Sequence, residues 1–284
     1  MKKLLRIALP QALVLAMLLA SVLPVWQEAS ASALRVTVDL TQDEVKEPQD
    51  RPPDVEVQII RREAADDGDA PRVLIYHSHT CEAYEPDFEG QYKQTERWRT
   101  ADNNYNVVRL GEELAGILRE QYGMTVVHDD TNFELPSLDN AYARSLEALE
   151  NYFARGETFD FYIDLHRDAY IEGLFAQNTV ETAQGEAARL MVLVGTGEGS
   201  WNGRDFAQKP DWEENLALAE AITDAVNELS PGLCRSPSVK TGRYNQHVST
   251  GALLVEVGNN RNTLSQALAA IPSLAQALAQ AAGV

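Results

Sequence analysis

Residues 73–82 read VLIYHSHTCE, and this short stretch already indicates the class of fold. Its first four residues are all apolar, a pattern typical of a strand that is buried on both faces of a sheet. The apolar run is followed directly by side chains that can bind a metal or a proton. In sheets of parallel strands, ligands bind beyond the carboxyl ends of the strands. The stretch therefore predicts an α/β protein whose functional residues follow a buried strand.

Apolar runs and helical patterns alternate along the rest of the sequence. Further runs that suit buried strands cover residues 124–127, 159–165, 188–194 and 252–257. Amphipathic helical patterns cover residues 106–121, 139–153, 212–229 and 262–281. Strands separated by helices predict a three-layer α/β fold, with a mostly parallel or mixed central sheet covered by helices on both faces.

Length and composition agree with a folded domain and exclude several classes of protein. Of the 284 residues, 44% are hydrophobic and 24% are charged, which excludes wholesale disorder. The formal net charge of -19 argues against nucleic acid as a partner, because phosphate binding needs clustered Lys and Arg. The two cysteines, Cys81 and Cys234, are too few for a disulfide-rich scaffold, and their spacing leaves a disulfide between them open.

The N-terminal part of the sequence predicts export. A basic start precedes an apolar stretch over residues 7–26, which is long enough to cross a bilayer. Small residues at 29–33 also suit cleavage, so we interpret residues 1–33 as a signal-anchor or a signal peptide. Residues 34–70 are acidic and contain proline, as in a linker, and residues 71–284 form the expected working domain. We expect that domain outside the cytoplasm, on a single membrane span or secreted.

Titratable side chains follow or interrupt several of the predicted strands. His79 and Glu82 come after the first strand, and His166 ends the third in the sequence DLHRD. Glu256 lies inside the apolar run 252–257, where a carboxylate is costly unless it is paired or bound to a metal. We expect its pKa to be perturbed, as a general base in a closed site requires.

These side chains suit a zinc hydrolase, which needs three protein ligands, an open position for water and a carboxylate that accepts the proton of that water.

His77 and His79 would point to opposite faces of a continuing strand, so only one is certain to face the site. Asp102, before the next predicted helix, suits a ligand and equally suits the cap of that helix. A single strand-end histidine is more often structural, and we interpret His128 in that way. Cys81 suits a zinc ligand or an incidental thiol.

Separated motifs along the chain also match a known pattern when they are taken in order. They are IYHSHT at 75–80, TADNNYNVVR at 100–109, DLHRDA at 164–169, VGT at 194–196, RYNQH at 243–247 and EVG at 256–258. Together they resemble the stage II sporulation protein P family, from about Arg72 to the C-terminus. That family consists of exported, membrane-anchored peptidoglycan hydrolases related to the zinc-dependent N-acetylmuramoyl-L-alanine amidases.

The resemblance implies an amidase that uses Zn²⁺ to cleave the bond between the lactyl group of N-acetylmuramic acid and the L-alanine of the stem peptide. It matches His79 and His166 to zinc ligands and Glu256 to the catalytic base. Asp102 stands where related amidases usually have a Glu as the middle ligand. Asp102 and Glu82 therefore remain alternatives for that position.

The oxyanion that develops in such a reaction needs a positive partner besides the metal. Arg243 and His247 are our candidates, against the alternative that their segment is only an ordered turn. Arg167 equally suits a carboxylate of the stem peptide.

The resemblance to this family also implies partners. They are peptidoglycan as substrate, the membrane through the N-terminal segment, and other engulfment proteins of sporulating cells, namely a lytic transglycosylase and a membrane scaffold. Two other functions stay open, an exported zinc peptidase that acts on cell-wall peptides and a catalytically silent wall-binding protein. Reaction products separate the two enzymes, because only an amidase frees the lactyl group of the muramic acid.

Overall fold

The computed structural model describes residues 70–169, 179–201 and 204–284 of the chain. The segment expected at residues 1–33, and all but the last residue of the linker expected at 34–70, lie outside the described residues. Within the described ranges, no helix has both the length and the apolar character needed to cross a membrane.

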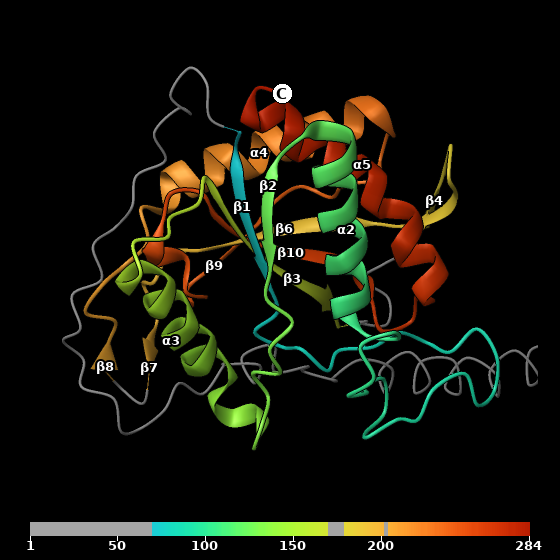
Figure 1. Ribbon diagram of the computed structural model, residues 1–284, viewed down its shortest axis with the longest axis horizontal. Coiled ribbons are helices and arrows are strands. Elements are labelled where there is room, and N and C mark those ends of the chain that lie inside the picture. Colours follow the sequence, from blue (N-terminus) through green and yellow to red (C-terminus); the bar gives the residue numbers. More distant parts are fainter. Residues whose placement is uncertain (1–69, 170–178, 202–203) are drawn as a thin grey trace, which may run out of the picture. The chain divides into compact units, whose positions relative to one another are not determined.

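A six-stranded sheet forms the centre of the domain (Figure 1). In spatial order its strands are β2 (Thr125–His128), β1 (Arg72–Tyr76), β3 (Phe161–Asp168), β10 (Ala252–Asn259), β6 (Leu190–Gly195) and β9 (Ser238–Lys240). The first four strands run parallel, whereas β6 runs antiparallel to β10 and β9 runs parallel to β6. The sheet is therefore mixed, and the predicted fold class is confirmed.

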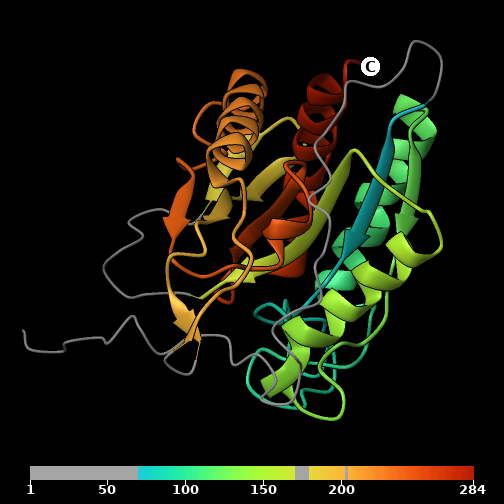
Figure 2. The same cartoon turned by 90° about the vertical axis from the view of Figure 1, so that its left-hand side faces the viewer.

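Helices cover both faces of this sheet (Figures 1 and 2). On one face, α5 (Leu264–Ala282) packs against both α2 (Val107–Tyr122) and α4 (Trp212–Leu229). These three helices share a core with the side chains of one sheet face, among them Leu165 and Val255. On the opposite face, α3 (Ala141–Ala154) forms a second core with Tyr162 and other residues of β1 and β3. The alternation of side chains along each strand separates the two cores.

Short elements lie outside the predicted pattern. The run at 188–194 is divided at Arg189, between β5 (Gly185–Ala188) and β6, and β5 pairs with β4 (Thr179–Thr182) in a hairpin. A second small hairpin joins β7 (Ser200–Trp201) to β8 (Arg204–Asp205). Two 3-10 helices complete the described elements, η1 (Leu138–Asn140) and η2 (Gln246–Val248).

The pairing of β10 with β3 is interrupted by a bulge just after Glu256. The register shifts between Glu256 and Asn259, and Gly258 has a φ of 65°. A Cβ atom at Gly258 would lie 2.7 Å from the Cβ of Ala188 and 2.8 Å from Oδ1 of Asn262. Glycine is therefore required here both by the backbone conformation and by the close approach of neighbouring chain.

A close contact on α2 leads to a first prediction, on stability. A Cβ atom at Gly111 would lie 2.5 Å from Nε2 of His128 and 2.6 Å from Nε2 of His77. We expect Gly111→Ala to lower the free energy of unfolding by about 1–3 kcal/mol, because the buried histidine pair must move. The matched control is Gly116→Ala on the same helix, where nothing lies within 4 Å of the new methyl group. Urea titration of both variants tests this, and equal stability of the two would contradict it.

Candidate metal centre

The functional side chains gather on the α3 side of the sheet, at the carboxyl ends of the parallel strands. Asp164 and His166 alternate with apolar residues on β3, so both face this side. Glu256 on β10 is the register partner of His166. The loop that follows β1 brings in residues 77–82 from the neighbouring strand. This is the position that parallel-strand topology predicts for a ligand site.

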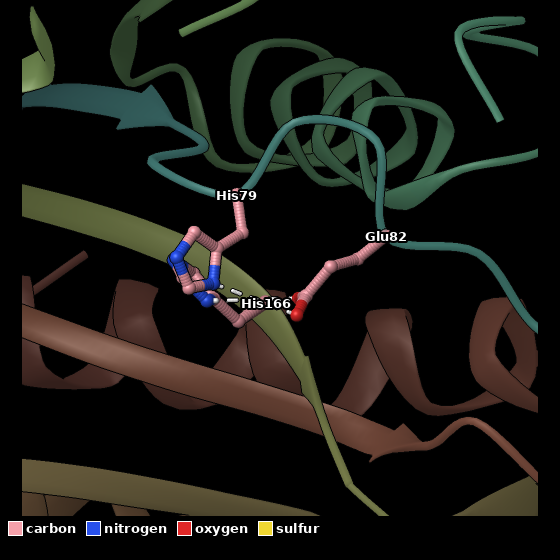
Figure 3. Close-up of side chains that lie close together, drawn as sticks. All are labelled: His79, Glu82 and His166. Atoms are coloured by element: carbon pink, nitrogen blue, oxygen red, sulfur yellow. Dashed lines mark ion pairs between the residues drawn. The ribbon is translucent and has the colours of Figure 1, made fainter. Parts of the chain in front are cut away.

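Three side chains form a cluster that can hold a metal ion, namely His79, Glu82 and His166 (Figure 3). One potential ligand atom from each residue lies within 4.8 Å of the other two. Nδ1 of His79 is 3.6 Å from Oε1 of Glu82, and Nδ1 of His166 is 3.6 Å from Oε2 of Glu82. The Glu82 carboxylate therefore faces two imidazoles, whose ring centroids lie 4.9 Å apart and which come from separate parts of the sheet edge (Figure 3).

Glu82 is buried and held as a carboxylate. The backbone N–H of Arg167 donates to Oε2 of Glu82 at 3.1 Å. Burial by itself would raise the pKa of Glu82, but the Arg167 guanidinium and the two cluster histidines outweigh it and hold that pKa well below its usual range. The middle position of the cluster thus carries a negative charge at neutral pH.

Arg167 holds the loop that carries Glu82 in place. Its Nε donates to the carbonyl of Ala83 at 3.0 Å, and its Nη2 donates to the carbonyl of Trp98 at 3.3 Å. Its side chain is 9% exposed and also lies 3.9 Å from the Glu82 carboxylate. These contacts argue against the expectation that Arg167 binds a stem-peptide carboxylate, because the guanidinium already ties the loop around Glu82 to β3.

Glu256 is buried beside the cluster, and its Oε2 has no hydrogen-bond partner among the described residues. Burial is the main reason that the pKa of Glu256 is raised to about 8, with Asp168 and Glu82 adding to the rise and His166 opposing it. The expectation that this pKa is perturbed is confirmed. A carboxylate in these surroundings accepts a proton readily, as a general base must.

Asp102, the other candidate for the middle position, lies outside the cluster. It is exposed, and its Oδ1 accepts hydrogen bonds from the backbone N–H of Asn104 at 3.1 Å and from Nδ2 of Asn104 at 2.8 Å. It does not cap α2 either, because Asn106 does so by accepting from the N–H of Val108. The chain between the strand and the helix is long enough to place Asp102 in a local turn instead.

His77 points away from the cluster, as the alternation of His77 and His79 allows. Its Nδ1 is 2.9 Å from the carbonyl oxygen of Leu165, and its Nε2 is 2.9 Å from Nε2 of His128. Burial lowers the pKa of His77 to about 3, so the ring is neutral. Nδ1 of His128 lies 3.3 Å from Oε2 of Glu112 on α2. His77 and His128 therefore form a structural pair that packs against α2.

The segment of Arg243 and His247 is an ordered turn. Tyr244 and Asn245 have φ values of 48° and 55°, and Nδ2 of Asn245 donates to the carbonyl of Tyr142 at 2.9 Å. His247 is buried, and burial holds its pKa well below the usual range, with Arg243 adding to the effect. The Arg243 guanidinium lies over the ring of Phe206 at 5.0 Å. Stabilisation of an oxyanion by Arg243 or His247 stays a prediction.

Aromatic rings connect this turn to the cluster. Tyr142, in the first turn of α3, packs edge-on against His79 with 5.1 Å between ring centroids. Tyr244 also packs against Tyr142, with 6.0 Å between ring centroids. Tyr142 was missed by the sequence reasoning because its position fits an ordinary amphipathic helix. Asp164 was also missed, although its spacing of two from His166 on a strand places both on one face.

The cysteines take no part in the cluster. Cys81 and Cys234 are both free and buried, so the disulfide that the spacing left open is not formed. Sγ of Cys81 accepts from Nδ2 of Asn132 at 3.4 Å, and burial raises the pKa of this thiol to about 11. An un-ionised thiol is a poor metal ligand.

Comparison with known sequences matches this chain to one protein family. The profile of the family described as Stage II sporulation protein P (SpoIIP) matches residues 23–279. Stage II sporulation protein P of Bacillus subtilis (strain 168) is 28% identical over 210 residues, which cover 70% of this chain and 48% of the relative. The chain thus spans about half the length of the curated relative that it matches.

Solved structures with a related arrangement were also found. One is N-acetylmuramoyl-L-alanine amidase AmiC2 of Nostoc punctiforme, with 15% identity and a TM-score of 0.42 over 74% of this chain and 96% of the other. Another is an N-acetylmuramoyl-L-alanine amidase from Clostridium difficile 630, with 15% identity and a TM-score of 0.43 over 74% and 95%. At these values the likeness by itself carries no argument about activity.

Proposed function

The chain belongs to the stage II sporulation protein P family, and from this premise we propose that it is an exported zinc-dependent N-acetylmuramoyl-L-alanine amidase that acts on peptidoglycan during sporulation. The observation that carries the proposal is the cluster of His79, Glu82 and His166 with the buried carboxylate of Glu256 beside it. Such a set is what a hydrolase with one metal and one general base requires.

The donor set fits zinc. Two imidazole nitrogens and one carboxylate oxygen are the ligand types that catalytic zinc sites use, and three protein ligands leave a position open. Glu82 is kept ionised by Arg167 and the two histidines, as a ligand must be. Bound there by His79, Glu82 and His166, zinc would supply an acidified water and polarise the scissile carbonyl.

The protein's own groups account for the remaining requirements. Glu256 lies next to the cluster, and its Oε2 makes no hydrogen bond to the residues that the structure describes, so it can accept the proton of the attacking water and return it to the leaving amine. Tyr142 packs edge-on against His79 and supports the position of that ring. Arg243 and His247 remain our candidates for contact with the developing oxyanion.

The cellular setting is part of the same proposal. Residues 1–33 would hold the chain in the cell membrane or direct its secretion, with the working domain outside the cytoplasm. The substrate would be the junction of glycan and stem peptide. A lytic transglycosylase and a membrane scaffold of the engulfment machinery are the proposed partners, on the basis of the family resemblance.

Digestion of purified peptidoglycan by the full-length protein in detergent tests the activity. We expect free stem peptides with an L-alanine N-terminus and glycan strands with free lactyl groups, detected by mass spectrometry. Treatment with 1,10-phenanthroline should abolish product formation, and after removal of the chelator about one zinc ion per chain should restore it. A zinc peptidase would instead shorten stem peptides that stay on the glycan. A catalytically silent wall-binding protein would release nothing under any of these conditions.

A further inference from the structure

The two ring nitrogens of His166 have different neighbours. Nδ1 lies on the side of Glu82, at 3.6 Å from its Oε2 (Figure 3). Nε2 lies 2.8 Å from Oδ1 of Asp164, two residues earlier on the same strand. A histidine that binds a metal through one nitrogen commonly donates the other N–H to a carboxylate, which fixes the orientation and the tautomer of the ring.

Asp164 is itself held firmly. It is 1% exposed, and the backbone N–H of Ser78 donates to its Oδ1 at 2.8 Å. The Ser78 hydroxyl donates to Oδ2 of Asp164 at 2.6 Å and lies 2.9 Å from Nε2 of His166. Because Ser78 directly precedes His79 in the chain, the Asp164 carboxylate connects the strand that carries one cluster histidine to the loop that carries the other.

The hydrogen bonds of Asp164 indicate which nitrogen of His166 carries a proton. Oδ1 of Asp164 accepts from the backbone N–H of Ser78 and Oδ2 accepts from the Ser78 hydroxyl, so both oxygens act as acceptors. An ionised carboxylate can only accept hydrogen bonds. Nε2 of His166 is therefore the nitrogen with the N–H, and in the neutral ring Nδ1 keeps its lone pair on the Glu82 side.

We propose that Asp164 is a positioning residue that fixes the Nε2–H tautomer of His166, presents Nδ1 to the metal, and through Ser78 sets the place of His79. This inference rests on the proposed function, because it assumes that the cluster binds zinc. Asp164 is not one of the three possible ligands of the cluster. Its effect is on the affinity of the site, and partners of this kind typically change metal affinity by about 10–100-fold.

The test is the zinc affinity of full-length Asp164→Asn, measured by competition with a chromophoric chelator. Asparagine keeps the size of the side chain and removes the charge. We expect zinc to bind about 10–100-fold more weakly than to the wild type. The matched control is Asp160→Asn, just before the same strand, where Oδ2 of Asp160 accepts from the N–H of Arg72 at 2.7 Å. This variant should bind zinc as the wild type does.

A second measurement needs no variant that could misfold. Nitrogen-15 NMR of histidine-labelled, zinc-loaded wild type should show Nδ1 of His166 bound to zinc and Nε2 carrying a slowly exchanging proton. Zinc bound through Nε2, or an Asp164→Asn variant with wild-type affinity, would overturn the inference and leave the proposed function standing. Absence of zinc binding by the wild type would overturn both.

Discussion

Replacing Glu256 by Gln is expected to slow peptidoglycan digestion by about 10²–10⁴-fold, the usual contribution of a general acid–base group. The substitution keeps the shape of the side chain and removes its ability to accept a proton. Because Glu256 is outside the cluster of His79, Glu82 and His166, the zinc content should stay at the wild-type level. Product release measured by mass spectrometry, together with zinc analysis of the same preparation, checks both parts.

The control for this variant is Glu186→Gln. Glu186 is an exposed carboxylate whose partners are Thr179 and Gln266, so its substitution should change neither activity nor zinc content. If Glu256→Gln retained activity within about tenfold of the wild type, a different group would have to move the proton. If it lost zinc as well, Glu256 would belong to the metal ligands.

Replacing Glu82 by Gln is expected to weaken zinc binding and so to lower activity when zinc is limiting. Structural zinc sites bind with about 10–16 kcal/mol, so loss of one of about four ligands costs roughly 3 kcal/mol, or about 100-fold in affinity. His166→Ala should have an effect of the same size. Zinc affinity and activity, measured on the same samples, check this expectation.

Asp102→Asn is the matched comparison for Glu82→Gln, because both change a carboxylate to its amide. Asp102 is exposed and accepts a hydrogen bond from Asn104, so the Asp102→Asn variant should keep both zinc and activity. The reverse result, with zinc lost from the Asp102 variant and kept by the Glu82 variant, would mean that the loop before α2 rearranges on binding the metal. Such a result would place Asp102 in the middle position.

Much of the fold could be predicted because its strands are continuous apolar runs. VLIY in β1 and ALLVEV in β10 are buried on both faces, and such runs stand out from the helical patterns between them. The direction of β6 could not be predicted, because a fully buried strand has the same apolar pattern in either direction. β9 has the sequence SVK, and a single apolar residue gives too little signal for a strand.

Those residues of the candidate site that come directly after a predicted strand could be predicted from the sequence. His79 and His166 were candidates because they follow strands whose carboxyl ends meet at one edge of the sheet. Glu256 was a candidate because it interrupts an apolar run, and the family resemblance selected His79 over His77. The choice between Glu82 and Asp102 depends on the path of a loop, which is fixed here by long-range contacts such as Arg167 with Ala83 and Trp98. A local sequence pattern does not contain contacts of that kind.

The bulge after Glu256 has a consequence for changes in chain length. Side chains alternate between the two faces of a sheet, so a slip of one residue in β10 would turn Glu256 from the α3 face into the core formed with α2, α4 and α5. Ala188 and Asn262 leave no room for a side chain at position 258, so the strand cannot shift by one residue to compensate. Single-residue insertions or deletions in β3 or β10 would therefore separate the base from the metal ligands, whereas the exposed turn between β4 and β5 can accept them.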